Sequence, residues 1–353
     1  MRKVRIEAGT PYDVLIGGGL LGQAGQLVGK TISPCRAVLV TDSNVASLYA
    51  DMLEERLTAS SFSVTRHVFP AGEEHKNMET LTGILEALAD TGLTRTDLVV
   101  ALGGGVTGDM AGLAASLYLR GVRYVQIPTT LLAAVDSSVG GKTAIDFAGR
   151  KNIVGAFYQP SLVLCDTDTF HTLTPEITRD GLSESIKYGV ICDASLFSRF
   201  ESKDMPDVDE IVTRCVAIKG NIVAQDEHDT GLRQLLNFGH TPGHAIEACS
   251  GYGVSHGHAV AVGMLIMARA ASRMGICTDD TALRLEQVLH NFGLPVTTPY
   301  RATELAAAAL ADKKRKGNEV TLVVPEKMGK CVLHRIPVTE LARFFACGME
   351  ERT

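Results

Sequence analysis

The pattern of hydrophobic and polar residues changes character about halfway along the chain. In the first half, short runs of aliphatic and β-branched residues alternate with stretches whose apolar positions recur at helical spacing. The runs that predict strands are 37–42, 62–69, 98–104, 124–130 and 162–166, and the helical stretches between them are 44–59, 78–91 and 107–120. Such alternation predicts a mainly parallel, doubly wound α/β sheet of the Rossmann-like kind.

After about residue 170 the pattern becomes one of longer amphipathic stretches rich in alanine, leucine and charged residues. These stretches are 208–226, 257–274, 281–292 and 302–313, whereas 319–324 and 331–334 are the runs expected to be extended. We therefore expect an α/β domain over residues 1–172, followed by an all-α domain over residues 173–353. Because no low-complexity linker separates them, the junction is predicted to be packed, a setting that active sites favour.

Composition and charge exclude two classes of partner. The chain of 353 residues carries a net charge of −6, which argues against nucleic acid, because nucleic-acid binding needs a broad basic surface to displace counterions. No stretch approaches the ~20 apolar residues of a membrane span, and the N-terminal segment has no apolar signal region. The eight cysteines are scattered without a CxxC pair, which favours reduced thiols. We expect a soluble, cytoplasmic protein.

The segment between residues 236 and 264 is rich in candidate metal ligands, with His240, His244, His256 and His258 in a glycine-punctuated stretch. Glu184, in the upstream motif ESIKYG, adds a carboxylate. Two neutral imidazoles and one carboxylate would hold a zinc-like ion with one coordination position open, as in a catalytic site rather than a closed structural one. The spacing alone leaves open which histidines are ligands.

A second candidate site is for a nucleotide. Gly103, Gly105 and Gly108 form a GxGxxG pattern after a predicted strand and before a predicted helix, which is the context in which such glycines approach a pyrophosphate. The alternative is a turn that serves only packing. Asp42, at the end of an earlier strand, is expected either to bind a ribose or to cap the next helix. Asp109 would repel a pyrophosphate, so we expect it to face ribose, nicotinamide or a metal-bound water.

A third set consists of basic and polar residues placed in glycine-rich or apolar segments, where an unpaired cation would be costly. Any one of them could be solvated surface. Taken together, they predict a small anionic substrate that carries both a phosphate and a carboxylate. The set comprises Arg120, Lys142, Lys151, Asn152, Lys187, Lys219, Arg233 and the run Lys313, Lys314, Arg315 and Lys316.

These motifs together resemble the 3-dehydroquinate synthase family. GGGVTGD, SSVGGKTAID, ESIKYG, LNFGHTPGHAIE and HGHAVAVGM occur in the family's order, and the resemblance covers nearly the whole chain. It implies an NAD-binding α/β domain, an α-helical domain, a catalytic zinc or cobalt ion, and a homodimer. The implied reaction converts 3-deoxy-D-arabino-heptulosonate 7-phosphate to 3-dehydroquinate and phosphate through transient oxidation by NAD, β-elimination, reduction and intramolecular aldol closure.

The resemblance also implies roles for individual residues. The metal ligands would be Glu184, His240 and His256, and the catalytic residues would be His244, Lys187, Asp136 and Arg120. The NAD site would comprise Asp42, Glu73, Lys76, Gly105, Gly108, Asp109, Thr129, Thr130, Lys142 and Lys151. Substrate would be bound through its phosphate by Arg120, Lys142, Asn152 and either Lys313 or Lys314, through its carboxylate by Lys219, Arg233 and Asn237, and by His244.

Two departures and several alternatives accompany this interpretation. His258 stands where many family members have glutamate, and we expect it behind the metal ligands or on the helix surface. Segment 172–180 lacks an arginine–glutamate pair common in relatives, so no contact is assigned to it.

The nearest alternatives are 2-deoxy-scyllo-inosose and 2-epi-5-epi-valiolone synthases, whose substrates lack the carboxylate. Metal-dependent polyol or glycerol-1-phosphate dehydrogenases would release NADH, and a non-catalytic regulator would be expected to have lost a metal ligand.

Overall fold

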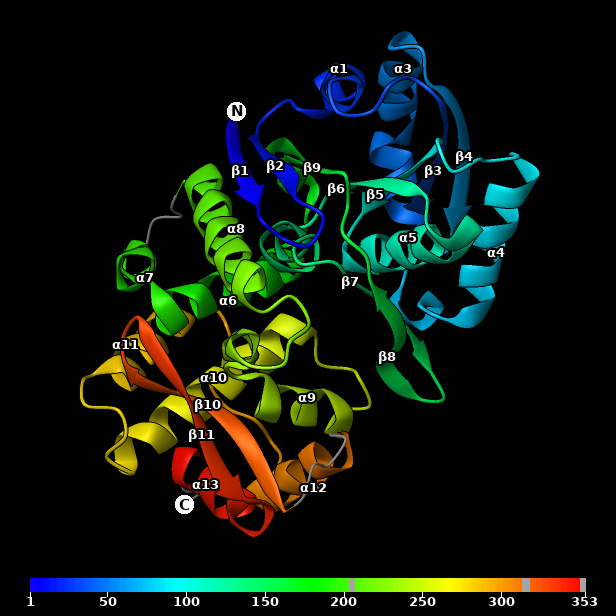
Figure 1. Ribbon diagram of the computed structural model, residues 1–353. Coiled ribbons are helices and arrows are strands. Elements are labelled where there is room, and N and C mark those ends of the chain that lie inside the picture. Colours follow the sequence, from blue (N-terminus) through cyan, green and yellow to red (C-terminus); the bar gives the residue numbers. More distant parts are fainter. Residues whose placement is uncertain (203–206, 313–317, 350–353) are drawn as a thin grey trace. The chain divides into compact units, whose positions relative to one another are not determined.

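The structure is a computed structural model that describes residues 1–202, 207–312 and 318–349 (Figure 1). The chain divides into two compact units. The first unit comprises Met1–Thr174 and Val212–His228, and the second comprises Pro175–Ile211 and Asp229–Thr353. None of the described helices is long and apolar enough to cross a membrane.

The first unit is built on a twisted sheet with the order β1-β2-β9-β6-β5-β3-β4. Only β1 runs antiparallel to its neighbour, so the predicted doubly wound, mainly parallel sheet is confirmed. The five predicted strands are all present, and an N-terminal hairpin extends the sheet. The strands are β1 (Arg2–Ile6), β2 (Tyr12–Gly17), β3 (Arg36–Asp42), β4 (Ser63–Phe69), β5 (Leu98–Gly103), β6 (Arg123–Pro128) and β9 (Leu162–Asp166).

Helices cover the sheet on two faces, because successive side chains of its central strands point to opposite sides. Leu39 and Val100 belong to an apolar cluster with α1 and α3, whereas Val38 and Val99 belong to a second cluster with α4 and α5. The helices of this unit are α1 (Ala24–Gly29), α2 (Ser43–Val45), α3 (Asp51–Ala59), α4 (Met78–Asp90) and α5 (Gly105–Leu117). A π-helical turn, Ala46–Ala50, joins α2 to α3 within the predicted helix 44–59.

The strand order reverses direction between β3 and β5. From β3 the chain continues outward to β4, whereas from β5 it continues to β6 and β9 on the other side. In doubly wound sheets, ligands bind beyond the carboxyl ends of the strands at such a switch point. Asp42 ends β3 and Gly103 ends β5, so the candidate nucleotide residues lie at this position.

A small hairpin of β7 (Lys142–Phe147) and β8 (Arg150–Phe157) belongs to the first unit and was not anticipated from the sequence. Its loop consists of Ala148 and Gly149, both with positive φ, as a type I′ turn requires. The predicted helix 107–120 ends at Leu117, and the residues up to Arg120 form a separate 3-10 turn.

The second unit is helical around α10, whose residues are buried along most of its length. Such a helix needs neighbours on every side, and α6, α9, α11, α13 and β10 pack against it. The helices are α6 (Pro175–Cys192), α7 (Ala194–Phe200), α9 (His240–Cys249), α10 (His256–Arg273), α11 (Thr281–Asn291), α12 (Ala302–Asp312) and α13 (Leu341–Gly348). The predicted extended runs form a hairpin of β10 (Glu319–Lys327) and β11 (Lys330–Pro337), which the description of this half as all-α leaves out.

One helix, α8 (Val208–Gln225), begins in the second unit and belongs to the first from Val212 onward. Its assignment rests on tertiary contacts that a helical pattern does not encode. Gly220 packs so closely on Ile6 that an added Cβ would lie 2.6 Å from the Ile6 Cδ1 atom. Just beyond the helix, the Glu227 carboxylate accepts hydrogen bonds from the Gly9 amide and the Gln159 side chain, both at 2.8 Å.

Candidate metal centre and nucleotide site

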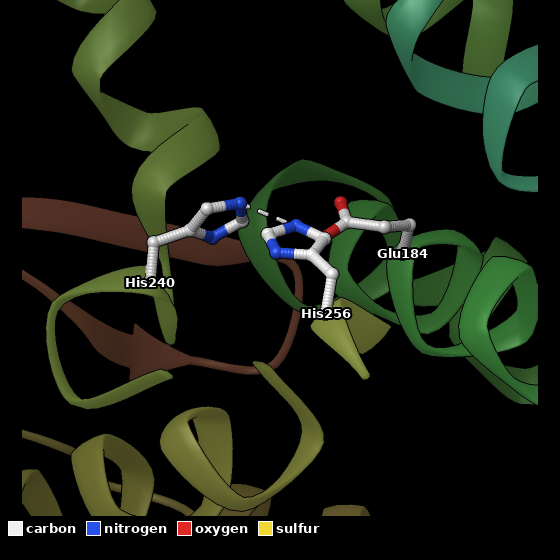
Figure 2. A group of neighbouring side chains, drawn as sticks. All are labelled: Glu184, His240 and His256. Atoms are coloured by element: carbon white, nitrogen blue, oxygen red, sulfur yellow. Dashed lines mark ion pairs between the residues drawn. The ribbon is translucent and has the colours of Figure 1, made fainter. Parts of the chain in front are cut away.

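Three side chains from three helices of the second unit converge on one point (Figure 2). Glu184 comes from the middle of α6, while His240 and His256 are the first residues of α9 and α10. The Nε2 atoms of both histidines lie 3.5 Å from the Oε1 atom of Glu184. The Glu184 side chain is fully buried. The structure thus brings together the three residues that the sequence resemblance singled out as metal ligands.

The two histidines come together because α9 and α10 approach closely through glycines. A Cβ added to Gly263 of α10 would lie 2.0 Å from the carbonyl oxygen of Gly239, which no side chain can tolerate. Gly239 itself has a φ of 79° and directly precedes His240. This left-handed conformation favours glycine, so a substitution there would be strained as well as crowded.

Each histidine is oriented by a second hydrogen bond on its other ring nitrogen. His240 Nδ1 lies 3.2 Å from the backbone carbonyl oxygen of Phe238, and His256 Nδ1 lies 3.3 Å from Oε2 of Glu247. With Nδ1–H donating to these oxygens, Nε2 is the nitrogen left to bind a metal ion. Partners of this kind fix the tautomer and ring orientation of metal-binding histidines. Glu247 was not predicted from the sequence, although its position three residues after His244 on α9 is a signal that points to it.

Charged groups surround the Glu184 carboxylate and set the protonation of the two histidines beside it. Glu184 forms a fully buried ion pair with Lys187, one turn further along α6. Burial and the Lys187 ammonium lower the pKa of His240 to about 3, which keeps this imidazole neutral. Burial alone would also lower the pKa of His256, but hydrogen bonds to Glu184 and Glu247 raise it to about 10, so a metal ion that binds Nε2 would have to displace a proton from this ring. Two imidazole nitrogens and one carboxylate oxygen within 4.8 Å of one another suit a zinc-like ion.

Among the described residues, a second group with the same spacing consists of His244, Glu247 and His256. Both groups include His256, so this histidine can be a metal ligand in only one of them at a time. The first fits a metal better because there both histidines keep an oxygen partner on Nδ1, whereas the second would take Glu247 away from its role as that partner. His244 stays beside the first group, with its ring centroid 5.4 Å from that of His240. His258 lies outside both groups and contacts Asp180 instead.

The candidate nucleotide residues gather at the switch point of the sheet in the first unit. Asp42 does cap the following helix, since its Oδ1 accepts hydrogen bonds from the Asn44 and Val45 amides at 3.0 and 3.1 Å. Its Oδ2 accepts a hydrogen bond from the Thr107 hydroxyl at 3.1 Å, which ties it to the start of α5. An aspartate that borders the glycine turn in this way can cap a helix and still face a ribose.

The glycines of this turn have separate roles. Gly105 begins α5, and its neighbour Gly104 is the N-cap without a capping side chain. Gly108 lies one turn later, where an added Cβ would come 2.9 Å from Gln126 of β6, so this glycine serves close packing of helix on sheet. Thr129 and Thr130 follow β6, and the buried Thr129 hydroxyl has no hydrogen-bond partner in the described part of the chain. A ligand at the switch point could provide one.

Predicted cofactor and substrate residues also form ion pairs in the first unit. The nearly buried Lys76 ammonium lies 2.6 Å from both the Asp109 carboxylate and the Asn152 side-chain oxygen. Burial raises the pKa of Asp109 against the pull of Lys76, while the surrounding carboxylates raise the pKa of Lys76 despite its burial. Lys151 pairs with Glu73 at 3.8 Å. Asp109, unexpected in a phosphate-binding turn, thus has a cation beside it.

The substrate residues of the first unit include one further buried contact. Lys219 Nζ lies 2.7 Å from the Asp136 carboxylate, which joins a predicted carboxylate-binding residue to a predicted catalytic one. Arg120 and Asn152 both have positive φ, at 65° and 54°, a strained conformation that is typical of functional sites when side chains carry it. Lys142 is exposed at the start of β7.

In the second unit, Arg233 and Asn237 share one 3-10 turn, Leu232–Asn237, that leads to His240. The Arg233 side chain is buried and Asn237 is exposed. Lys187, also predicted to be catalytic, lies beside Glu184 as described above. Lys313 and Lys314, of which one was expected to bind phosphate, lie outside the described residues.

Comparison with known proteins identifies similar chains over both halves. Family models described as 3-dehydroquinate synthase N-terminal and C-terminal match residues 66–180 and 181–315. The 3-dehydroquinate synthase of Streptococcus suis (strain 05ZYH33) is 41% identical over 343 residues, covering 95% of this chain and 97% of that one.

Two solved structures have the same fold. One is 2-deoxy-scyllo-inosose synthase with carbaglucose-6-phosphate, NAD+ and Co2+, with a TM-score of 0.88 at 24% identity over 98% of this chain and 99% of that one. The other is 2-epi-5-epi-valiolone synthase from Streptomyces hygroscopicus subsp. jinggangensis 5008 with NAD+ and Zn2+, with a TM-score of 0.87 at 29% identity over 99% of both chains.

Proposed function

This chain belongs to the 3-dehydroquinate synthase family, and from that premise we propose that it converts 3-deoxy-D-arabino-heptulosonate 7-phosphate to 3-dehydroquinate and phosphate. The observation that carries the proposal is the group of Glu184, His240 and His256, in which each histidine presents Nε2 to the carboxylate and binds an oxygen through Nδ1. The reaction needs NAD and a divalent metal, zinc or cobalt, both of which the residues described above would accommodate.

We propose that Glu184, His240 and His256 would hold the metal ion. When bound there, the ion would supply Lewis-acid chemistry, making a substrate hydroxyl more acidic so that its carbon can be oxidised. Lys187 would hold the Glu184 carboxylate in place through their buried ion pair. His244, with its ring near both metal-binding histidines, would orient the substrate and relay a proton when phosphate leaves.

For the cofactor, we propose that NAD lies at the switch point between β3 and β5. Asp42 would accept hydrogen bonds from a ribose, and the glycine turn at the start of α5 would receive the pyrophosphate. The pair formed by Lys76 and Asp109 would complete this site, supported by Glu73, Thr129, Thr130 and Lys151. The predicted domain of residues 1–172 would then bind NAD, whereas the proposed metal ligands lie in the predicted domain of residues 173–353.

Substrate recognition would require cations for two anionic groups. We assign the phosphate to Arg120, Lys142 and Asn152, and the carboxylate to Lys219, Arg233 and Asn237. Arginine suits a carboxylate because its planar fork can donate two parallel hydrogen bonds. The alternative substrates, which belong to 2-deoxy-scyllo-inosose and 2-epi-5-epi-valiolone synthases, have no carboxylate for Arg233 to bind. The sequence relatives named 3-dehydroquinate synthase also favour the carboxylate-bearing substrate.

Two further properties follow from the family resemblance. We propose that the protein is a homodimer, which multi-angle light scattering after size exclusion tests by giving twice the mass of 37.7 kDa. We also propose that it acts in the cytoplasm, in keeping with eight free thiols in the described chain.

The function is tested by following two signals in one reaction. Purified protein is mixed with 3-deoxy-D-arabino-heptulosonate 7-phosphate, NAD and zinc, while phosphate release and NADH absorbance are recorded together. Steady phosphate release without NADH accumulation, abolished by a chelator, is the expected result because NAD is regenerated in every turnover. Accumulating NADH would point to a polyol dehydrogenase. If neither phosphate nor NADH is produced, a sugar phosphate that lacks the carboxylate is tried next. Turnover of that compound would point to another cyclase.

A further inference from the structure

Asp180, a residue with no role predicted from the sequence, joins two of the helices that carry the proposed metal ligands. It lies on α6, four residues before Glu184, and its Oδ1 atom meets the first turn of α10. This oxygen accepts hydrogen bonds from the Ser255 hydroxyl at 2.6 Å and from the His258 amide at 3.1 Å. It also lies 2.9 Å from Nδ1 of His258. A single carboxylate oxygen therefore contacts residues on both sides of His256.

The contact replaces the usual cap of a helix. The first amides of a helix have no partner within it, and the side chain of the N-cap residue ordinarily accepts one of these bonds. Here the N-cap residue of α10 is Ser255, whose side chain makes no capping bond. The carboxylate of Asp180 accepts the His258 amide in its place, so that the cap of α10 comes from a different helix. The hydrogen bond that caps α10 therefore also links α10 to α6.

The backbones of the two helices touch at the same place. A Cβ added to Gly257 would lie 2.3 Å from the Asp180 Cα atom and 2.5 Å from its carbonyl oxygen. Both are distances that no side chain can tolerate, so glycine is required for this approach. Gly257 follows His256 directly, and Glu184 is one helical turn beyond Asp180. If α6 and α10 moved apart at Gly257, the distance between Glu184 and His256 would therefore increase as well.

We propose that Asp180 is a positioning residue of the metal centre, which sets the distance between Glu184 and His256 by holding the first turn of α10 against α6. This inference rests on the proposed metal site. Two carboxylates then position different parts of His256. Glu247 orients its ring through Nδ1, and Asp180 fixes the backbone from which the ring extends. The His258 ring then serves as a second side-chain donor to Asp180, after the Ser255 hydroxyl, rather than as a metal ligand.

The test compares zinc binding by Asp180→Ala, Asp180→Asn and a matched control, Asp193→Ala. Asp193 caps α7 in the same unit and accepts the same kinds of hydrogen bond, from the Ser195 hydroxyl at 2.9 Å and the Leu196 amide at 3.0 Å. Zinc affinity is measured by competition with a chromophoric chelator, the coordination of cobalt by its visible absorption spectrum, and the stability of the metal-free proteins by thermal unfolding.

We expect Asp180→Ala to bind zinc about 10- to 100-fold more weakly than the unmodified chain and to alter the cobalt spectrum, as is typical when residues that orient metal ligands are removed. Asp180→Asn, which keeps an oxygen able to accept from Ser255 and His258, should recover most of the affinity. Asp193→Ala should lower the unfolding temperature to a similar extent and leave zinc affinity unchanged. Zinc affinity in Asp180→Ala equal to that of the unmodified chain, or reduced equally in Asp193→Ala, would overturn the proposal.

A second variant covers the case in which Asp180→Ala does not fold. The double variant Ser255→Ala, His258→Ala removes two side-chain donors and leaves the amide of residue 258 bound to Asp180. It should weaken zinc binding about tenfold, within the range for such partners, and unchanged affinity and cobalt spectrum would count against this link between α6 and α10. If the unmodified chain binds no zinc, or if His240→Ala binds it equally well, the metal site itself is wrong and the inference fails with it.

Discussion

The ammonium of Lys219 donates hydrogen bonds to both the carboxylate and the backbone carbonyl of Asp136, each with an Nζ–O distance of 2.7 Å. This contact connects α8 to the π-helical turn Ala133–Ser137 that follows β6. The Lys219 side chain is only 7% exposed, so the pair is protected from the screening that weakens surface ion pairs. A residue proposed to bind substrate thus also has a structural partner.

Replacement of this lysine should affect both stability and substrate binding. We expect Lys219→Met to lower the free energy of unfolding by about 1–3 kcal/mol, because the Asp136 carboxylate loses a charged donor. The KM for the sugar phosphate should rise at least about tenfold, the effect of losing about 1.4 kcal/mol of binding. Lys3→Met is the control, since Lys3 pairs with Asp13 at 2.7 Å but is 60% exposed. Its variant should differ in stability by less than about 1 kcal/mol. Urea unfolding and steady-state kinetics measure both variants. If Lys219→Met and Lys3→Met changed the free energy of unfolding and the KM equally, the prediction would be contradicted.

Removal of a metal ligand should remove metal and activity together. His240→Ala leaves Glu184 and His256 as two ligands, so we expect zinc content after dialysis to fall to background and turnover to fall by more than about 100-fold. His290→Ala serves as the control, because His290 is a mostly exposed histidine on α11. Metal analysis by mass spectrometry and phosphate release check both variants. Full zinc and full rate in His240→Ala would refute the ligand assignment.

The pair of Lys76 and Asp109 should behave as a buried charge pair. We expect Lys76→Met to destabilise the protein by about 3 kcal/mol, because the buried Asp109 carboxyl loses the cation that offsets its burial. NAD binding, measured by calorimetry, should weaken as well. Adding Asp109→Asn should recover at least half of the lost stability, since it removes the uncompensated carboxylate. Additive losses in the double variant would show that the two residues act independently.

Arg233 should be specific for the carboxylate of the substrate. Arg233→Lys keeps the charge but loses the planar fork, so we expect the KM for the carboxylate-bearing substrate to rise about 10- to 100-fold, which corresponds to about 1.4–2.7 kcal/mol. NAD affinity and zinc content should stay as they are in the unmodified chain. Steady-state kinetics, calorimetry and metal analysis distinguish these effects. An unchanged KM would favour a substrate without the carboxylate.

Asp97 should make the stability depend on pH. Burial alone would raise the pKa of Asp97, but hydrogen bonds from Thr94 and from the Arg36 amide lower it below its ordinary value of 3.8. A lowered folded-state pKa contributes stability that is present above pH 3.8 and is lost as the pH falls through the folded-state value. Asp97→Asn should thus cost about 1–2 kcal/mol at pH 7 and progressively less below pH 4.

Urea unfolding at pH 7, 5 and 3.5 measures this dependence. Asp90→Asn provides the control, because Asp90 is exposed at the end of α4. That control should show a small difference at every pH. A cost for Asp97→Asn that is constant down to pH 3.5 would contradict the assigned pKa direction.

The sequence determined the elements and the types of residue at the site. Strands such as 98–104 and helices such as 257–274 were predicted because side-chain periodicity is a local property of each segment. The glycine pattern at Gly103, Gly105 and Gly108 is also local to one segment, and it predicted a nucleotide-binding turn. The motifs around Glu184, His240 and His256 carried the family resemblance, which picked two histidines from four.

Only the tertiary structure decided how these residues are held. That Glu247 orients His256, that Lys76 neutralises Asp109, and that Asp180 caps a helix other than its own depend on how separate segments pack. The hairpin of β7 and β8 and the assignment of Val212–His228 to the first unit likewise depend on contacts between residues far apart in the chain. Periodicity records which side of an element is buried, but it does not record the partner against which that side packs. The partners are fixed only when close approaches, such as that of Gly257 to Asp180, bring distant segments together.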